Sequence, residues 1–184
     1  MLQRHGTKRR KMSHFHQSSE ASATWQSLTR EGNRDYARKN LRKARAHYEE
    51  AMEEARSLLC QFQETGLPLS TPVMLVVSCH NLADLFFGQK EPEQAVLFLR
   101  HACVELTRLA GLPALPLQAR LACVEQLRPA VVSLMEHGDR TVSEQQETQN
   151  LVLRARSAAL SVYQIAGYAA QTRLEDAPVM GRPS

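Results

Sequence analysis

Apolar residues recur at spacings of three and four along most of the chain, which is the period of an amphipathic α-helix. The longest stripe begins near Leu41 and reaches Phe62, and charged residues of both signs occupy its opposite side. Another stripe runs from Ala95 to Ala110. No segment shows the strict alternation that a half-buried strand requires. The pattern therefore predicts an all-α protein.

Glycine and proline divide this pattern into six predicted helices. Gly66 followed by Pro68 is typical of a helix end, and Thr71 followed by Pro72 is typical of a helix start. Pro129 lies inside the fifth helix, so we expect a kink or a break there. The six helices are expected to start near residues 21, 41, 71, 92, 116 and 141, the last with the capping box Thr141-Val142-Ser143-Glu144.

The N-terminal segment differs from the rest in charge. Residues 1–11 carry five Lys or Arg and no acidic residue, and without them 18 Lys+Arg face 19 Asp+Glu, a net charge of −1. Met12 is an alternative start of translation, which would remove this basic segment from the protein. We expect a disordered basic tail over residues 1–20, a helical domain over 21–171 and a flexible tail over 172–184.

Composition narrows the functional classes. With 184 residues, 43% of them apolar, the chain is large enough for one domain with its own core. Its longest apolar run is 73–77, too short to span a bilayer, and no export signal is visible, so we expect a cytoplasmic protein without a membrane partner. The four cysteines have no metal-site spacing and are expected to be buried. No catalytic, nucleotide or metal motif appears, so we expect no enzyme and no cofactor.

Two of the predicted helical pairs repeat each other with an offset of 51 residues. Small residues stand where two helices would cross, and larger ones stand between them. The aligned residues are Ala44, Tyr48 and Ala51 in one pair and Ala95, Leu99 and Ala102 in the other.

This pattern resembles the tetratricopeptide repeat, most closely over His80-Asn81-Leu82-Ala83-Asp84-Leu85-Phe86 and the following Pro92-Glu93-Gln94-Ala95. The resemblance implies three antiparallel helical hairpins stacked as a short right-handed α-solenoid. The sequence departs from the family in its period, since the usual repeat has ~34 residues. Lys39 and Lys90 also stand where a turn glycine is expected, and the third pair, from Pro116, carries almost none of the signature. A generic helical bundle is the alternative.

In the resembled family, the first helix of each hairpin lines a groove that takes an extended peptide or a partner's helix. Asn33 and Asn81 match positions at which asparagine amides hold a peptide main chain or carboxylate, but Thr29 stands where a basic residue would complete such a clamp. The implied groove residues are Gln26, Thr29, Arg30, Asn33, Val77, His80, Asn81, Asp84, Phe87 and Arg120.

The sequence thus predicts a non-enzymatic module, adaptor or chaperone-like, that binds another protein in this groove. Phe87 has two interpretations, contact with the partner or packing between hairpins, because Phe86 beside it takes the core position. A homodimer is compatible with the exposed end of a short stack. The alternative function is nucleic-acid association through the basic N-terminal tail, although no basic helix face or aromatic platform supports it.

Overall fold

The computed structural model describes the backbone of residues 4–137 and 142–175, and the side chains of 20–137 and 144–172. The described residues confirm the all-α prediction, since they form six helices and no strand. The helices are α1 (Arg4–Ala37), α2 (Leu41–Thr65), α3 (Thr71–Gly88), α4 (Pro92–Ala110), α5 (Leu117–His137) and α6 (Val142–Glu175).

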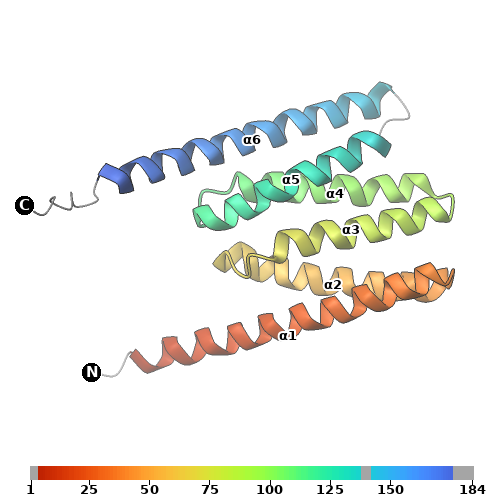
Figure 1. Ribbon diagram of the computed structural model, residues 1–184, viewed down its shortest axis with the longest axis horizontal. Helices are drawn as coiled ribbons and strands as arrows, with labels where there is room; N and C mark the ends of the chain where they lie inside the picture. Colours follow the sequence, from red (N-terminus) through yellow and green to blue (C-terminus); the bar gives the residue numbers. More distant parts are fainter. Residues whose placement is uncertain (1–3, 138–141, 176–184) are drawn as a thin grey trace, which may run out of the picture.

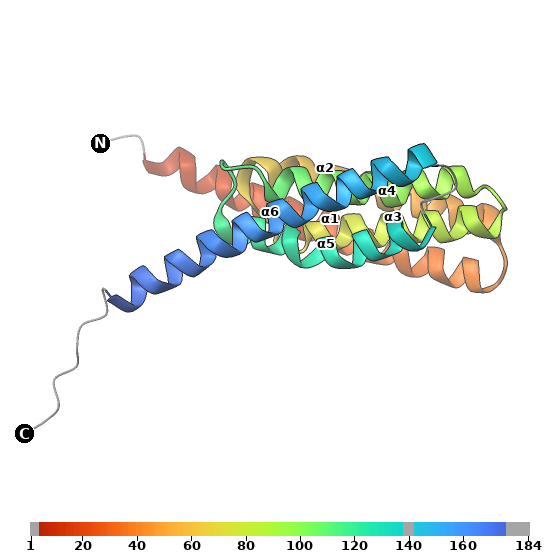
Figure 2. The same ribbon diagram turned by 90° about the horizontal axis from the view of Figure 1, so that it is seen from above.

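The helices form one stack in chain order, and each runs opposite to its neighbour (Figure 1). Each helix packs on the next one along the chain, and further contacts join α1 to α3, α3 to α5 and α4 to α6. Seen from above, α2 and α4 lie on one side of the stack and α3 and α5 on the other (Figure 2). The first part of α1 and the last part of α6 extend beyond the stack at the same end.

The turns after α1 and α3 are the same structure repeated 51 residues apart. Lys39 and Lys90 have left-handed backbones, with φ of 62° and 63°. In each turn the next N–H group donates to a carbonyl oxygen five residues earlier, Asn40 to Asp35 and Glu91 to Phe86, both at 2.9 Å. This is the Schellman arrangement that ends a helix, and it normally uses glycine at the left-handed position. The two aligned pairs therefore share their turn geometry as well as their sequence pattern.

The core is built from aliphatic and small residues of α2 to α6. Ala44 and Ala95, the aligned alanines, are fully buried, which lets the helix axes approach closely. A smaller cluster joins α1, α2 and α3 beneath Trp25, whose Nε1 donates to the buried hydroxyl of Ser78 at 2.8 Å. α3 is the one described helix that is long and apolar enough to cross a membrane, and most of it is buried inside the stack.

Three expectations about the elements need correction. α1 begins at Arg4 and not near Ala21, so part of the expected disordered tail is helical; no proline interrupts residues 4–20. α5 is not broken at Pro129, which lies on the exposed side of the helix, where water can reach the carbonyl left without its usual donor. Cys60 is exposed on α2, whereas the other three cysteines are buried as expected. Gly138, Thr141 and residues 176–184 lie outside the described residues.

Candidate functional site

The odd-numbered helices α1, α3 and α5 contact one another in sequence, and we call the side of the stack that they form the odd-helix face. Its middle element, α3, keeps one stripe of side chains accessible at helical spacing. Val73 and Asp84 are exposed, and Val77 and His80 between them are half-buried. Asn81 is half-buried beside this stripe. A helix enclosed by four neighbours thus presents a strip that is apolar at one end and acidic at the other.

α1 adds polar side chains to the same face. Gln26, Arg30 and Asn33 are exposed, as the resemblance implied. The Nε of Arg30 donates to the main-chain oxygen of Gln26 at 3.2 Å, which holds the guanidinium along the helix. The Oδ1 of Asn33 accepts a hydrogen bond from the hydroxyl of Tyr48 at 2.9 Å. One side of the Asn33 amide is therefore used inside the protein.

Tyr48 reaches Asn33 because Gly32 leaves room for its ring. A Cβ built on Gly32 would lie 2.5 Å from both Cδ1 and Cε1 of Tyr48, so the ring lies directly against the α1 backbone. Burial, and to a smaller extent the nearby Tyr36 and Asp84, raises the pKa of Tyr48 to about 12. The phenol is thus a neutral hydrogen-bond donor at the edge of the face. Neither the contact of Tyr48 with Gly32 nor its hydrogen bond to Asn33 was predicted.

His80 is the most unusual polar group of the α3 stripe. Its Nε2 is enclosed and has no hydrogen-bond partner among the described residues. Burial lowers the pKa of His80, and the carboxylate of Asp84 opposes this shift only in part. The imidazole is therefore held neutral, and its enclosed Nε2 would need a movement of the ring before it could bond an incoming group.

Three of the implied groove residues are buried or make contacts within the fold. Thr29 is only 8% exposed, so the position where a clamp would need a basic residue is covered. Phe87 packs its ring against that of His137 on α5, with centroids 4.8 Å apart, which agrees with the packing interpretation. The Nε of Arg120 donates to the main-chain oxygen of Ala110 at 2.8 Å. Arg120 therefore caps the end of α4, a contact that the sequence analysis did not predict.

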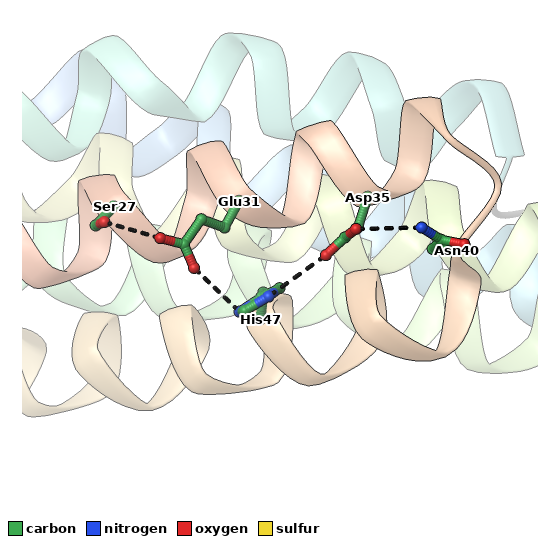
Figure 3. A network of polar contacts seen from close by, with 5 residues as sticks. All are labelled: Ser27, Glu31, Asp35, Asn40 and His47. Carbon is green, nitrogen blue, oxygen red and sulfur yellow. Dashed lines mark hydrogen bonds and ion pairs between the residues drawn. The ribbon is translucent and has the colours of Figure 1, made fainter.

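A polar network that was not predicted joins α1 to α2 (Figure 3). The imidazole of His47 lies between two carboxylates, with Nε2 at 3.4 Å from Asp35 Oδ2 and Nδ1 at 3.7 Å from Glu31 Oε2. Ser27 donates to Glu31 and Asn40 donates to Asp35, each at 3.4 Å. Glu31 and Asp35 are four residues apart, a spacing that places them on one side of a helix and could have suggested the network.

This network lies on the other flank of α1 from the odd-helix face. Ser27, Glu31 and Asp35 follow one stripe of the helix, and Gln26, Arg30 and Asn33 follow another, with buried Gly32 between them. His47 has its two carboxylates on opposite sides of the ring (Figure 3). Such an arrangement fixes the pairing of α1 with α2 and does not gather ligands around one point. Among the described residues, no group of three or more His, Cys, Asp or Glu could hold a metal ion.

The fold and this face define an all-helical stack with one partly accessible central helix. Residues 23–171 match a family described as "Protein of unknown function (DUF2753)", and the chain belongs to that family. The match begins within α1 and ends near the end of α6, so it covers the packed part of the stack. No curated protein and no solved structure gave a significant match.

Proposed function

We propose that this protein is a non-enzymatic binding module that takes a segment of a partner protein on its odd-helix face. The observation that carries the proposal is the α3 stripe: Val73, Val77, His80 and Asp84 stay accessible on a helix whose other sides are packed. The apolar end would bury aliphatic side chains of the partner segment. Asp84 would then attract a basic residue, which gives the segment a direction.

We further propose that the stack is a divergent tetratricopeptide-like solenoid made of three hairpins. Three facts support this arrangement. The turns at Lys39 and Lys90 are equivalent and 51 residues apart, and the aligned alanines Ala44 and Ala95 are both fully buried. The contacts from α1 to α3 to α5 also follow the order expected when the first helices of successive hairpins line one side.

The incomplete clamp limits which partner segments would fit. Because Thr29 is covered and the Nε of Arg120 donates to the end of α4, neither position supplies a free basic side chain for a terminal carboxylate. The half-buried amide of Asn81 can instead hydrogen-bond the main chain of an internal segment. We therefore propose that this protein acts as an adaptor or chaperone-like module and recognises an internal helix or extended segment of its partner.

The test is quantitative capture of proteins from a native cell extract by the full chain and by the double variant Asn81→Ala, Asp84→Ala. The matched control is Glu50→Ala, which removes an exposed carboxylate from α2, on another surface. We expect at least one protein that is retained after nuclease treatment by the wild type and the control, and lost by the double variant. Equal retention by all three chains would contradict the proposal.

A second candidate, association with nucleic acid, is favoured by one observation. Because α1 continues to Arg4, the basic residues 4–11 belong to the part of that helix that extends beyond the stack (Figure 1). Neutralising several phosphates makes binding fall steeply with salt. The candidate therefore predicts salt-sensitive retention of nucleic acid by the full chain that is lost when residues 1–11 are deleted.

A further inference from the structure

α6 carries a long uncharged segment on the surface of the protein. Residues 157–172 contain no Asp, Glu, Lys or Arg. The outward side of α2 shows the ordinary pattern, with charged residues of both signs between Arg42 and Arg56. A helix at the edge of a soluble stack normally has such a charged side facing water. The absence of charge from this segment indicates that another molecule covers it.

The uncharged segment is also rich in exposed large apolar side chains. Leu160 and Tyr163 are each 54% exposed, and Tyr168 is 73% exposed. Leu153, two helical turns before Leu160, continues the same stripe, and Ile165 borders it. The opposite side of α6 packs on α4 and α5 through residues such as Leu151, Ala155 and Val162. We call the exposed stripe Leu153, Leu160, Tyr163, Gly167 and Tyr168 the α6 outer stripe.

We propose that the α6 outer stripe is a dimer interface, covered by the same stripe of a second copy of this chain. In a two-fold dimer the same surface of both copies meets, so charged residues of one sign would repel each other across the interface. From residue 157 to 172 the stripe avoids this repulsion because it carries no charge, and the exposed Arg156 lies where the stripe reaches Leu153. It also gives no charge pattern by which a different protein would be selected.

The size of the stripe is close to what a specific dimer needs. At roughly 200 Å² for a fully exposed aromatic side chain, covering Tyr163 and Tyr168 in both copies removes about 500 Å² from water. Leu153, Leu160 and Ile165 are exposed to a similar degree and add a comparable area. With Ile165 at its border included, the total then reaches the ~1,000 Å² that a biological interface should clear, just below the range of stable dimers.

The α6 outer stripe also leaves space for a second helix to pack against it. A Cβ built on Gly167 meets no atom within 4 Å, so nothing in the described structure lies above this glycine. A glycine on a helix surface lets the partner helix come close. The last part of α6 also extends past the α4–α5 turn, where a second copy can reach it without meeting the body of the first (Figures 1 and 2).

The experiment is a measurement of the mass of the full chain in solution by sedimentation equilibrium, from about 1 to 100 μM. We expect twice the 20.7 kDa of one chain at the upper concentrations. Leu160→Glu places two carboxylates against each other across the two-fold axis and should weaken association by roughly 100-fold or more. Tyr168→Glu serves as a second variant at a more exposed position. The matched control is Leu97→Glu, which changes a leucine on α4 that is 57% exposed and should leave the mass unchanged.

Far-UV circular dichroism and a thermal melt accompany each variant, so that loss of the dimer is distinguished from loss of the fold. Dimers of wild type and Leu97→Glu, with folded monomers of the two α6 variants, would support the proposal. A wild-type monomer at 100 μM would overturn it, and so would variants that remain dimeric. Flotation of a monomeric wild type with phosphatidylcholine vesicles, lost in Leu160→Glu, would overturn it by assigning the stripe to a lipid surface.

Discussion

Lys39 and Lys90 adopt the same left-handed backbone, with φ of 62° and 63°, at equivalent turns 51 residues apart. Neither position has the glycine that this conformation favours, so each lysine imposes a local steric cost. The cost is tolerated because the turn fixes the pairing of α1 with α2 and of α3 with α4.

Replacing either lysine with glycine should stabilise the protein. We expect Lys39→Gly and Lys90→Gly each to raise the free energy of unfolding by about 1 kcal/mol, since glycine takes the left-handed conformation without a Cβ clash. Denaturant unfolding followed by circular dichroism measures the change. Lys43→Gly, on the exposed side of α2, is the control and should lower stability by about 1 kcal/mol. A loss of stability in both turn variants would contradict this account of the turns.

Gly32 should be intolerant of even a methyl group. Because its Cβ would meet the ring of Tyr48 at 2.5 Å, we expect Gly32→Ala to destabilise the fold by ~1–3 kcal/mol through overpacking. Gly167→Ala, where the Cβ meets open space, should instead stabilise α6 by about 1 kcal/mol. Combining Gly32→Ala with Tyr48→Leu should recover part of the loss, since the two positions share one space. Additive effects would show that the ring does not depend on the glycine.

The cysteines should differ sharply in reactivity. Burial raises the pKa values of Cys79, Cys103 and Cys123 to about 12 each, so almost none of these thiols is ionised at pH 8. Cys60 is exposed. Titration of native protein with a thiol reagent should therefore give one fast equivalent, and Cys60→Ser should remove it. The other three equivalents should appear only with denaturant; more than one fast thiol in the native protein would contradict the described burial.

Acidification should destabilise the fold partly through His80. Burial lowers its pKa below the ordinary value of about 6.5, so below pH 6.5 the unfolded chain binds more protons at this residue than the folded chain. The free energy of unfolding should then fall as pH decreases from 7 toward 5. His101, whose pKa is lowered first by burial, contributes in the same direction. His80→Gln should make the profile flatter over this range, and an unchanged slope would show that His80 does not carry the effect.

The helices could be predicted because their signals are local. Leu41, Thr71 and Pro92 begin α2, α3 and α4 as expected. An apolar stripe starts near each boundary, and a proline lies in the first turn of α3 and of α4. The start of α1 was missed because residues 4–20 lack an apolar period. No proline interrupts residues 4–20, so their sequence does not oppose the helix.

The odd-helix face was harder to predict because it depends on contacts between residues that are far apart in the sequence. Arg120 was placed in the groove from its helix number, yet the end of α4 binds its side chain. The hydroxyl of Tyr48 reaches Asn33 across Gly32, a contact that alignment of two pairs does not reveal. Val77, His80 and Asp84 were correctly placed at accessible positions because they follow one stripe of a single helix.

The most direct test of partner binding on the odd-helix face is photo-crosslinking inside native cells. The photoreactive residue p-benzoylphenylalanine replaces Asp84 on α3 in one chain and Glu50 on α2 in a control chain, both at exposed positions. We predict a discrete protein adduct from position 84 and none from position 50. Equal adducts from both positions, or an adduct from position 50 alone, would contradict the claim that this face binds the partner.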